Sequence, residues 1–372
     1  MRILHVIDSL GVGGAETMLA VLANAFAEEG HAVQVCATRT GGATESLISK
    51  GIPVHILGRT SRYDFRGLLR FRRLVSQGAF EIIHAHGWST GAFVTAARLL
   101  FGMRFGFVMH DHQGKSEAGS VVHDLLRRST VQALSCYVGA SEAALARARK
   151  AGVPADRSFC ILNALPVAPI DGFEKADIDG EFHKTSDEAT TGLCLAGIRR
   201  EKGILELIHA LAMIRVEKAY RILVAGGVRD REYVLACERA ILKHGLSGKI
   251  ALIGEVPGGK DLLRRADFCV IPSLSESGPL VLIEAMLAGV PFVCTRTGEV
   301  AEAAMSAGLK AFVTPGSPEE LAREIQLLLE MDAAARRERG RVAKQFAKDK
   351  FDIRGRVSEW LRVYERARAI GL

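Results

Sequence analysis

The chain has 372 residues, 48% of them hydrophobic, and a formal net charge of +7. This is enough apolar material for two domains, each with a core of its own. No run approaches the ~20 uninterrupted apolar residues that a membrane-spanning helix needs, so we expect a soluble protein. The positive charge suits anionic partners such as nucleotides, acidic lipid headgroups or nucleic acid.

The N-terminal residues alternate in polarity and reach Asp8 early, which predicts a first strand and not a signal peptide. The seven cysteines are scattered, and no two stand in a C-x-x-C spacing. An odd number without that spacing argues against a disulfide framework and against a structural zinc site. A reducing, cytoplasmic location is therefore expected.

In the first half of the chain, strand-like runs alternate with helix-like segments. Strands are predicted at residues 3–8, 33–37, 54–57, 82–85, 105–109 and 133–138, and helices at 15–29 and 142–150. Residues 166–190 break the pattern with prolines, glycines and acidic side chains, which is typical of a linker. The alternation then restarts, with strands at 193–196, 222–225, 250–253, 268–271 and 292–295.

A final helix places Ile353, Val357, Trp360, Leu361 and Tyr364 on one apolar face. The predicted organisation is a first domain over 1–165, a linker over 166–190, a second domain over 191–350 and a C-terminal helix over 351–372. Strands that alternate with helices form parallel sheets covered on both faces. The fold class is therefore two tandem, doubly wound α/β domains, with a ligand site in the cleft between them.

The strongest local motif runs from Pro272 to Met286. A polar loop carrying Glu276 follows a predicted strand, and Pro279 is expected to open a helix, because its fixed φ suits the first helical position. The N–H groups of Leu280 and Val281 would then form an anion site that the helix dipole reinforces.

Glu284 is the only charge between Pro279 and Thr295, in a helix that looks apolar on every face. A buried carboxylate without partners costs several kcal/mol or more. One interpretation is a core carboxylate paired with a cation or a backbone N–H. The other is a carboxylate that accepts hydrogen bonds from the hydroxyls of a ligand.

Two further loops follow predicted strands. Arg199, Arg200 and Lys202 precede a helix, where cations would bind a diphosphate; a solvated basic turn is the alternative. The segment from Leu10 to Glu16 contains Gly13 and Gly14, which let backbone approach an anion closely. It is not the dinucleotide motif G-x-G-x-x-G, because its sixth position is Glu16.

Histidines cluster at His84, His86, His110 and His112, near the ends of two predicted strands. A metal site is one interpretation. Polar residues of a cleft are the preferred interpretation, with His110 best placed to touch a substrate, and no metal is expected.

Another cluster is basic, with aromatic and aliphatic residues between its members: Arg59, Arg62, Arg66, Arg70, Arg72 and Arg73. It predicts either a helix on an anionic membrane or a solvated surface helix.

Taken together, these motifs resemble glycosyltransferase family 4. Glu276 and Glu284 stand with seven residues between them, like the family's E-x7-E region. The segment 13–16 resembles its N-terminal loop, 81–86 its D-x-x-H-x-H strand, and 199–203 its R-x-x-K-G element. The motifs arrive in the family's order, although Pro279 stands where many members carry glycine and Ile198 stands where many carry arginine.

The resemblance implies the GT-B fold and retention of anomeric configuration. Glu276 would bind hydroxyls of the transferred sugar, Glu284 the ribose of the nucleotide, and His110 would lie by the reacting centre. Arg199 or Arg200, with Lys202, would stabilise the departing diphosphate. Backbone of the donor site would come from Gly13, Gly14, Gly278, Pro279, Leu280 and Val281. No metal or other cofactor is implied, and the acceptor would bind mainly to the first domain.

The predicted function is therefore a retaining, hexosyltransferase-type enzyme that moves a sugar from a nucleotide-sugar to a saccharide or lipid-linked acceptor, in cell-surface polysaccharide or glycolipid synthesis. Its partners would be that donor and acceptor, with an anionic membrane through the segment 59–73 and without nucleic acid. The location would be cytoplasmic, at the inner face of the plasma membrane. The alternatives are a sugar-nucleotide epimerase, a phosphorylase, and a non-catalytic membrane-associated scaffold.

Overall fold

The computed structural model describes residues 1–61, 64–112, 121–167, 189–256 and 259–371. The chain divides into two compact units. The first unit comprises Met1–Gly172 together with Phe351–Leu372, and the second comprises Phe173–Lys350. Most of the predicted linker over 166–190, and Arg62 of the basic segment, lie outside the described residues.

The first unit is built on a seven-stranded, all-parallel sheet with the order β3-β2-β1-β4-β5-β6-β7. Its strands are β1 (Arg2–Ser9), β2 (Ala32–Thr40), β3 (Val54–Ile56), β4 (Ile82–His86), β5 (Gly106–Asp111), β6 (Cys136–Gly139) and β7 (Ser158–Cys160). Its helices are α1 (Gly14–Glu28), α2 (Phe65–Gly78), α3 (Trp88–Phe101), α4 (Val121–Ala133), α5 (Glu142–Lys150) and α13 (Val357–Gly371), with short 3-10 turns at Ala43–Leu47, Ala155–Arg157 and Ile353–Gly355.

The second unit has a six-stranded, all-parallel sheet with the order β10-β9-β8-β11-β12-β13. Its strands are β8 (Thr190–Leu195), β9 (Tyr220–Ala225), β10 (Ile250–Gly254), β11 (Phe268–Ile271), β12 (Phe292–Thr295) and β13 (Phe312–Val313). Its helices are α7 (Ile204–Met213), α8 (Arg231–Lys243), α9 (Leu280–Ala288), α10 (Glu299–Ser306), α11 (Pro318–Glu330) and α12 (Ala333–Phe351), and 3-10 turns lie at Arg200–Lys202 and Gly259–Arg265.

Local sequence accounts for where several helices begin. The side chains of Asp64, Ser141, Asp230 and Ser317 accept hydrogen bonds from backbone N–H groups in the first turns of α2, α5, α8 and α11. These side chains satisfy donors that a helix start leaves without an intrahelical partner. Strands β4, β5 and β6 are buried along their whole length, as expected for strands covered on both faces by helices.

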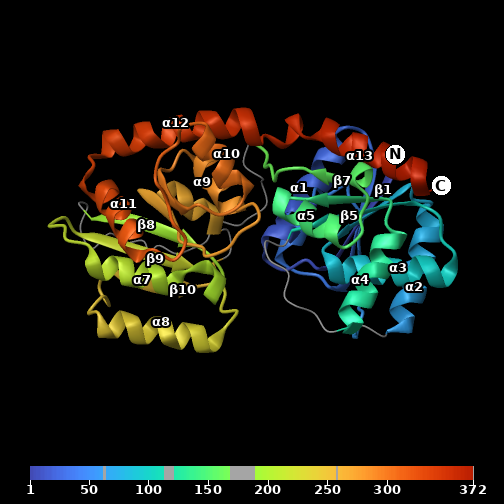
Figure 1. Cartoon of the computed structure of the whole chain (residues 1–372), viewed down its shortest axis with the longest axis horizontal. Coiled ribbons are helices and arrows are strands. Elements are labelled where there is room, and N and C mark those ends of the chain that lie inside the picture. Colours follow the sequence, from blue (N-terminus) through green and yellow to red (C-terminus); the bar gives the residue numbers. More distant parts are fainter. Residues whose placement is uncertain (62–63, 113–120, 168–188, 257–258, 372) are drawn as a thin grey trace. The chain divides into compact units, whose positions relative to one another are not determined.

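The C-terminal helix α13 packs against the first unit, chiefly over strand β5 (Figure 1). Trp360 and Tyr364 on its apolar face are almost completely buried, and the Tyr364 ring lies 4.8 Å from that of Phe26 in α1. Ile353, predicted to share this helix, instead lies in the preceding 3-10 turn. No helix among the described residues is both long enough and apolar enough to cross a membrane.

Candidate functional site

The two loops with the strongest sequence motifs meet at one point of the second sheet. Strand β8 lies between β9 and β11, so the chain turns to one side after β8 and to the other side after β11. In open parallel sheets, ligands bind at the carboxyl ends of the strands where the order reverses in this way. The loop at 196–203 follows β8 and the loop at 272–279 follows β11. Both therefore border the expected ligand-binding crevice of this unit.

Lys202 and Glu276 form an ion pair at this point. Lys202 Nζ lies 2.5 Å from Glu276 Oε1, although the two residues are 74 positions apart in the chain. The hydroxyl of Ser273 donates to the same carboxylate oxygen at 2.8 Å. The side chains are 20% and 14% exposed, so the pair is largely shielded but open to solvent on one side. The sequence predicted ligand roles for both residues but did not predict that they contact each other.

Backbone contacts fix the relative position of the two loops. Leu274 N–H donates to the carbonyl of Glu201 at 2.8 Å. Gly203 has φ +65°, and a Cβ atom there would lie 2.0 Å from the carbonyl oxygen of Pro272. Only glycine tolerates both the left-handed backbone and this approach. The carbonyl of Ser273 also accepts the hydroxyl of Thr295 at 2.6 Å. Contacts of both loops, with each other and with Thr295, therefore fix the geometry of the ion pair.

The start of α9 is the predicted anion site. Pro279 is the residue before the helix, with ψ 108°, and Leu280 is the first helical residue; the prediction that Pro279 occupies the first helical position was wrong by one residue. No side chain caps this end. At the start of α7, by contrast, the Tyr233 hydroxyl accepts from Leu205 N–H at 2.9 Å. The N–H groups of Leu280 and Val281 thus keep the orientation that suits an anion.

Glu284 differs from its predicted environment. It is half-buried and not enclosed in an apolar interior. Val281, Leu287 and Ala288 are also half-buried, so α9 has a partly exposed stripe at helical spacing. After burial and two neighbouring thiols, the charge of Glu284 is a further cause that raises the pKa of Cys269 in β11. The carboxylate therefore lies near that strand, on the accessible side of the helix.

The predicted phosphate-binding arginines are on the surface. Arg199 and Arg200 are both exposed, and Arg199 Nε lies 3.8 Å from a carboxylate oxygen of Glu201. An exposed pair at this distance contributes little to stability. Either guanidinium remains a candidate for the diphosphate.

The first unit repeats the topology of the second. Strand β1 lies between β2 and β4, and the glycine-rich loop follows β1. Helix α1 begins at Gly14 with Gly13 before it, and no side chain caps this end. The loop is held by the 3-10 turn that starts at Ala43: Thr44 N–H donates to the carbonyl of Leu10 at 3.0 Å, and its hydroxyl donates to that of Gly11.

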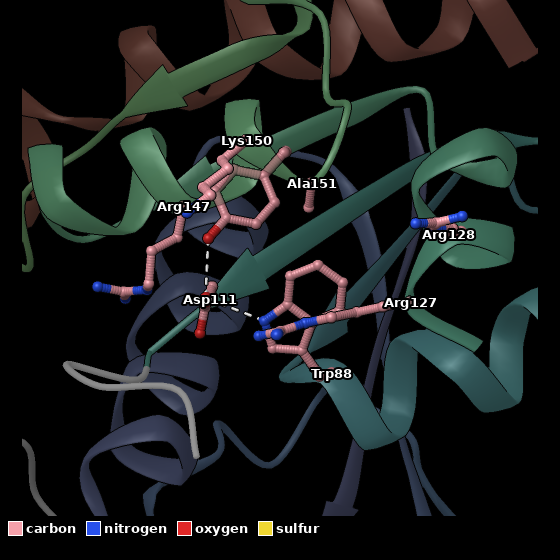
Figure 2. Close-up of a pocket in the computed structure, with 8 residues that line it drawn as sticks. Trp88, Asp111, Arg127, Arg128, Arg147, Lys150 and Ala151 are labelled. Carbon is pink, nitrogen blue, oxygen red and sulfur yellow. Dashed lines mark hydrogen bonds between the residues drawn. The ribbon is translucent and has the colours of Figure 1, made fainter. Parts of the chain in front are cut away.

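Asp111, the last residue of β5, is oriented by two aromatic residues (Figure 2). Its Oδ2 atom accepts from Trp88 Nε1 at 3.0 Å and from the Tyr137 hydroxyl at 2.8 Å. Burial, followed by the charge of Asp111, raises the pKa of Tyr137, so this phenol remains a donor.

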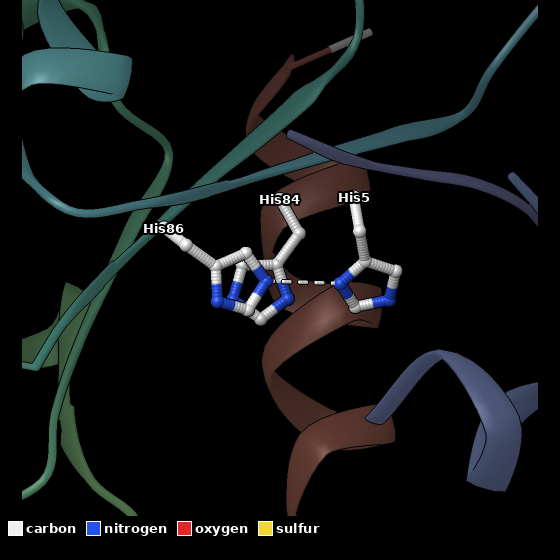
Figure 3. Close-up of side chains that lie close together, drawn as sticks. All are labelled: His5, His84 and His86. Carbon is white, nitrogen blue, oxygen red and sulfur yellow. Dashed lines mark hydrogen bonds between the residues drawn. The ribbon is translucent and has the colours of Figure 1, made fainter. Parts of the chain in front are cut away.

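Five histidines line the face of the first sheet that α13 covers. They are His5, His84, His86, His110 and His112, and three are drawn in Figure 3. His5 Nδ1 lies 3.1 Å from His86 Nε2, and His86 Nδ1 lies 3.0 Å from His112 Nε2. The Tyr364 hydroxyl lies 2.7 Å from His84 Nδ1. Hydrogen-bond contacts thus join His5, His86 and His112, and ring contacts bring His84 and His110 into the same cluster.

Burial keeps these imidazoles neutral. It lowers the pKa of His5 to about 3 and that of His112 to about 4. The pKa values of His84, His86 and His110 are also well below the usual range, because burial is reinforced by the neighbouring imidazoles. A neutral imidazole has only one N–H. His86 therefore donates a hydrogen bond in one of its contacts with His5 and His112 and accepts one in the other.

The nitrogens of two histidine triads lie within 4.8 Å of one another, close enough to be considered for a metal. However, both nitrogens of His86, which belongs to both triads, already face other imidazoles. A metal would have to displace those contacts, and the expectation that no metal binds stays a prediction.

His110 lies deeper than predicted. It is 0% exposed, and the ring of Trp360 lies 4.8 Å away. Both of its ring nitrogens are buried without a hydrogen-bond partner in the described structure. Buried polar atoms are normally paired, so the position is unusual, and neither nitrogen is exposed to a ligand in this structure.

Comparison with known protein families identifies both halves of the chain. Residues 12–168 match the model described as Glycosyltransferase Family 4, and residues 178–346 match that of Glycosyl transferases group 1. The chain belongs to glycosyltransferase family 4. Predictions of the family and of the transferase class are therefore confirmed.

Individual relatives agree with this assignment. This glycosyltransferase is 26% identical over 383 residues to a D-inositol 3-phosphate glycosyltransferase of Pseudarthrobacter chlorophenolicus, a match that spans 94% of this chain and 88% of the relative. It is also 26% identical to an uncharacterized glycosyltransferase of Methanocaldococcus jannaschii, over 67% of this chain and 66% of the relative.

Among solved structures, this glycosyltransferase is similar to HepE of Anabaena in complex with UDP-glucose. The TM-score is 0.80 at 21% identity, and the match covers 97% of this chain and 99% of HepE. This likeness shows the fold, and the predicted GT-B class with two Rossmann-like parallel sheets is confirmed.

The predicted site residues are divided between the two units. The second unit joins Lys202 and Glu276 next to the start of α9, and the first unit holds Gly13, Gly14 and His110. Sequence reasoning missed the supporting residues Ser273, Thr295 and Tyr364. Ser273 lies three residues before Glu276, in the same polar loop, and Tyr364 lies on the apolar face of the last helix, so both could have been flagged as neighbours of the predicted residues.

Proposed function

We propose that this glycosyltransferase is a retaining enzyme that transfers a hexose from a nucleotide-sugar donor to a saccharide or lipid-linked acceptor. The observation that carries the proposal is the ion pair of Lys202 with Glu276, held at the strand-order reversal of the second sheet beside the uncapped start of α9. A cation and free N–H groups suit a diphosphate, and carboxylates suit sugar hydroxyls. HepE, which shares the fold, binds UDP-glucose.

Each group has a distinct role in this proposal. An ammonium has three N–H donors, so Lys202 can keep its contact with Glu276 and still donate to a phosphate oxygen. The N–H groups of Leu280 and Val281, with Arg199 or Arg200, assist there. Glu276, oriented by Ser273, accepts from hydroxyls of the transferred sugar, and Glu284 accepts from the ribose.

The proposed transfer takes place on one face of the sugar. The bond from C1 to the diphosphate oxygen breaks, the bond from C1 to the acceptor oxygen forms, and the acceptor proton passes to the departing phosphate. Lys202 and the start of α9 stabilise the negative charge of the leaving diphosphate in place of a metal ion.

A thermal-shift series tests the donor site. UDP, GDP, ADP and their glucose conjugates are titrated against the full chain, and one of them at 100 times its dissociation constant should stabilise it by roughly 2.7 kcal/mol. Lys202→Met and Glu276→Gln should abolish the shift, and Lys243→Met, an exposed lysine of the same unit, should not. If none of the nucleotides binds, or if binding survives both substitutions, the proposal is wrong. NMR of the product then reports whether the anomeric configuration is retained.

We also propose a peripheral position on an anionic, cytoplasmic membrane surface, in keeping with synthesis of cell-surface polysaccharide or glycolipid. Helices α2 and α3 expose large apolar side chains: Phe65 (53%), Leu69 (41%), Leu99 (67%) and Leu100 (55%). Exposed arginines Arg66, Arg70, Arg72 and Arg73 accompany them on α2. Apolar and basic side chains together are typical of interfacial helices.

One member of the predicted basic segment has another role. Arg59 is 8% exposed, pairs with Asp8 at 2.8 Å and lies over the Phe93 ring, so its inclusion among surface cations was wrong.

Sedimentation with phosphatidylglycerol-containing vesicles tests the membrane proposal. Leu69→Ser and Leu99→Ser together should weaken binding, and Leu242→Ser, at a more exposed leucine of the second unit, should not. Equal binding by all three proteins would contradict it.

A further inference from the structure

A third loop of the second unit contacts the proposed donor site. It comprises residues 295–299, from the end of β12 to the start of α10. Strand β12 pairs in parallel with β11, so this loop leaves the same edge of the sheet as the loop that carries Glu276. None of the sequence motifs includes residues 296–299, and the roles proposed above for the donor use none of them.

Thr295 holds the backbone on one side of Glu276. Its hydroxyl donates to the carbonyl of Ser273 at 2.6 Å, and both residues are 2% exposed. The Ser273 hydroxyl in turn donates to Glu276 Oε1 at 2.8 Å. A buried carbonyl that loses its partner is costly, so this contact resists displacement. Thr295 therefore fixes the backbone from which the Ser273 hydroxyl reaches the carboxylate.

The turn at Gly298 holds the backbone on the other side. The carbonyl of Ser277, which directly follows Glu276, accepts from Glu299 N–H at 3.1 Å. Gly298 has φ +78°, and a Cβ atom there would lie 2.7 Å from the same carbonyl oxygen. Only glycine allows both this backbone conformation and this close approach. Helix α9 begins three residues after Ser277, so the contact also positions the uncapped start of that helix.

These contacts leave one oxygen of Glu276 for a ligand. Lys202 Nζ and the Ser273 hydroxyl both approach Oε1. Within the described part of the chain, Oε2 has no hydrogen-bond partner. A carboxylate oxygen accepts about two hydrogen bonds, so Oε2 can accept from hydroxyls of the transferred sugar. Where Oε2 lies depends on the backbone at Ser273 and Ser277, which the third loop holds.

We propose that residues 295–299 are a positioning element of the donor site, with two separable effects. Thr295, through Ser273, orients the Glu276 carboxylate toward the transferred sugar. Gly298, through Ser277, positions the start of α9, where the diphosphate binds. The inference rests on the proposed transferase function and deepens it, because it names residues that determine how the sugar is held without touching the donor.

Calorimetric titration of the full chain tests this inference by comparing a nucleotide-sugar with its nucleoside diphosphate. UDP-glucose and UDP are the first pair, and the GDP or ADP pair replaces it if thermal shift selects that nucleotide. Thr295→Val should weaken the nucleotide-sugar about tenfold and the diphosphate less than about threefold, because the lost hydroxyl acts through Glu276. Thr295→Ser, which keeps the hydroxyl, should restore the affinity. Gly298→Ala should weaken both ligands about tenfold.

Thr191→Val is the matched control. Thr191 is a buried threonine of β8, 7% exposed, and its hydroxyl makes no hydrogen bond to either donor-site loop among the described residues. This variant should bind both ligands as the unchanged chain does. Ser273→Ala removes the next link to Glu276 and leaves Thr295 in place, so it should show the same selective loss even if Thr295→Val does not fold. Urea unfolding of each variant reports whether it folds.

The inference is wrong if folded Thr295→Val and Ser273→Ala bind the nucleotide-sugar as tightly as the unchanged chain does. It is also wrong if they lose the diphosphate to the same extent as the nucleotide-sugar, or if Thr295→Ser does not restore binding. A different result counts against the proposed function: if the unchanged chain binds none of the nucleotides, the donor site itself is wrongly assigned.

Discussion

The two units share one topology but place different chemistry at the same point of it. In each sheet the first strand of the unit lies between the second and the fourth, so the strand order reverses there. In the second unit that point holds a charged pair, Lys202 with Glu276. In the first unit the two strands at the reversal, β1 and β4, themselves carry His5 and His84, which are neutral and paired in register.

This difference explains how one fold can divide a transfer reaction. A charged, partly open pair can bind a diphosphate and sugar hydroxyls, and it can stabilise charge that develops on a leaving group. A buried network of neutral imidazoles carries no charge of its own and so offers no comparable stabilisation of a leaving group. Because the topology is shared, this local electrostatic difference is what supports placing the donor on the second unit in the proposed function.

The largest expected effect comes from removing the charge of the pair. Lys202→Met and Glu276→Gln should each lower kcat by about 10²- to 10³-fold, the loss typical when a group that stabilises transition-state charge is removed. Steady-state kinetics with the donor found by thermal shift measures this, with Lys243→Met as the control. Near-normal turnover in both variants would show that the charged pair does not distinguish the second unit.

The next effect concerns the backbone that positions the pair. Gly203→Ala should destabilise the second unit by about 1–3 kcal/mol, because the left-handed backbone is strained with a side chain, and the contact with the Pro272 carbonyl adds to this. Denaturant unfolding measures the change. Gly248→Ala is the matched control, because a Cβ there meets nothing within 4 Å. Equal unfolding free energies for the two variants would mean that the loops do not depend on this approach.

A pH dependence of stability should also distinguish the first unit. The histidine cluster has folded pKa values below the unfolded value of about 6.5, so below that pH the unfolded chain binds more protons. The contribution of these histidines to the unfolding free energy should be complete above pH 6.5. It should fall as the pH is lowered to 4.5, by up to about 1.4 kcal/mol per pH unit for each histidine. Carboxylates add to the loss only at lower pH.

Urea titrations between pH 7.5 and 4.5 measure this slope. His5→Gln should make it shallower, and His244→Gln, an exposed histidine of the second unit, should leave it unchanged. A slope that does not respond to His5→Gln would show that the cluster is not the neutral, buried network described above.

Much of the fold was predictable because apolar runs of four or more residues mark buried parallel strands. All the predicted strands are present, whereas β7 and β13 were missed because three and two residues are too short for a periodic pattern. The family was predictable because its motifs combine residue type with fixed spacing.

Environment was less predictable than position. Glu284 seemed buried because the exposed stripe of α9 consists of Val281, Leu287 and Ala288, which are apolar themselves. Arg59 seemed exposed because it stands among surface arginines, although it pairs with Asp8. The contact of Lys202 with Glu276 depends on β8 and β11 being neighbours, which residue spacing alone does not give.

Hydrogen–deuterium exchange with and without the nucleotide-sugar tests the central assignment most directly. With a donor chosen from UDP-, GDP- and ADP-glucose, protection should be greatest in peptides covering residues 196–203 and 272–288 of the second unit, and Lys202→Met should remove it. Protection confined to the first unit, or unchanged exchange in both loops at saturating donor, would contradict the assignment of Lys202 and Glu276 to the donor.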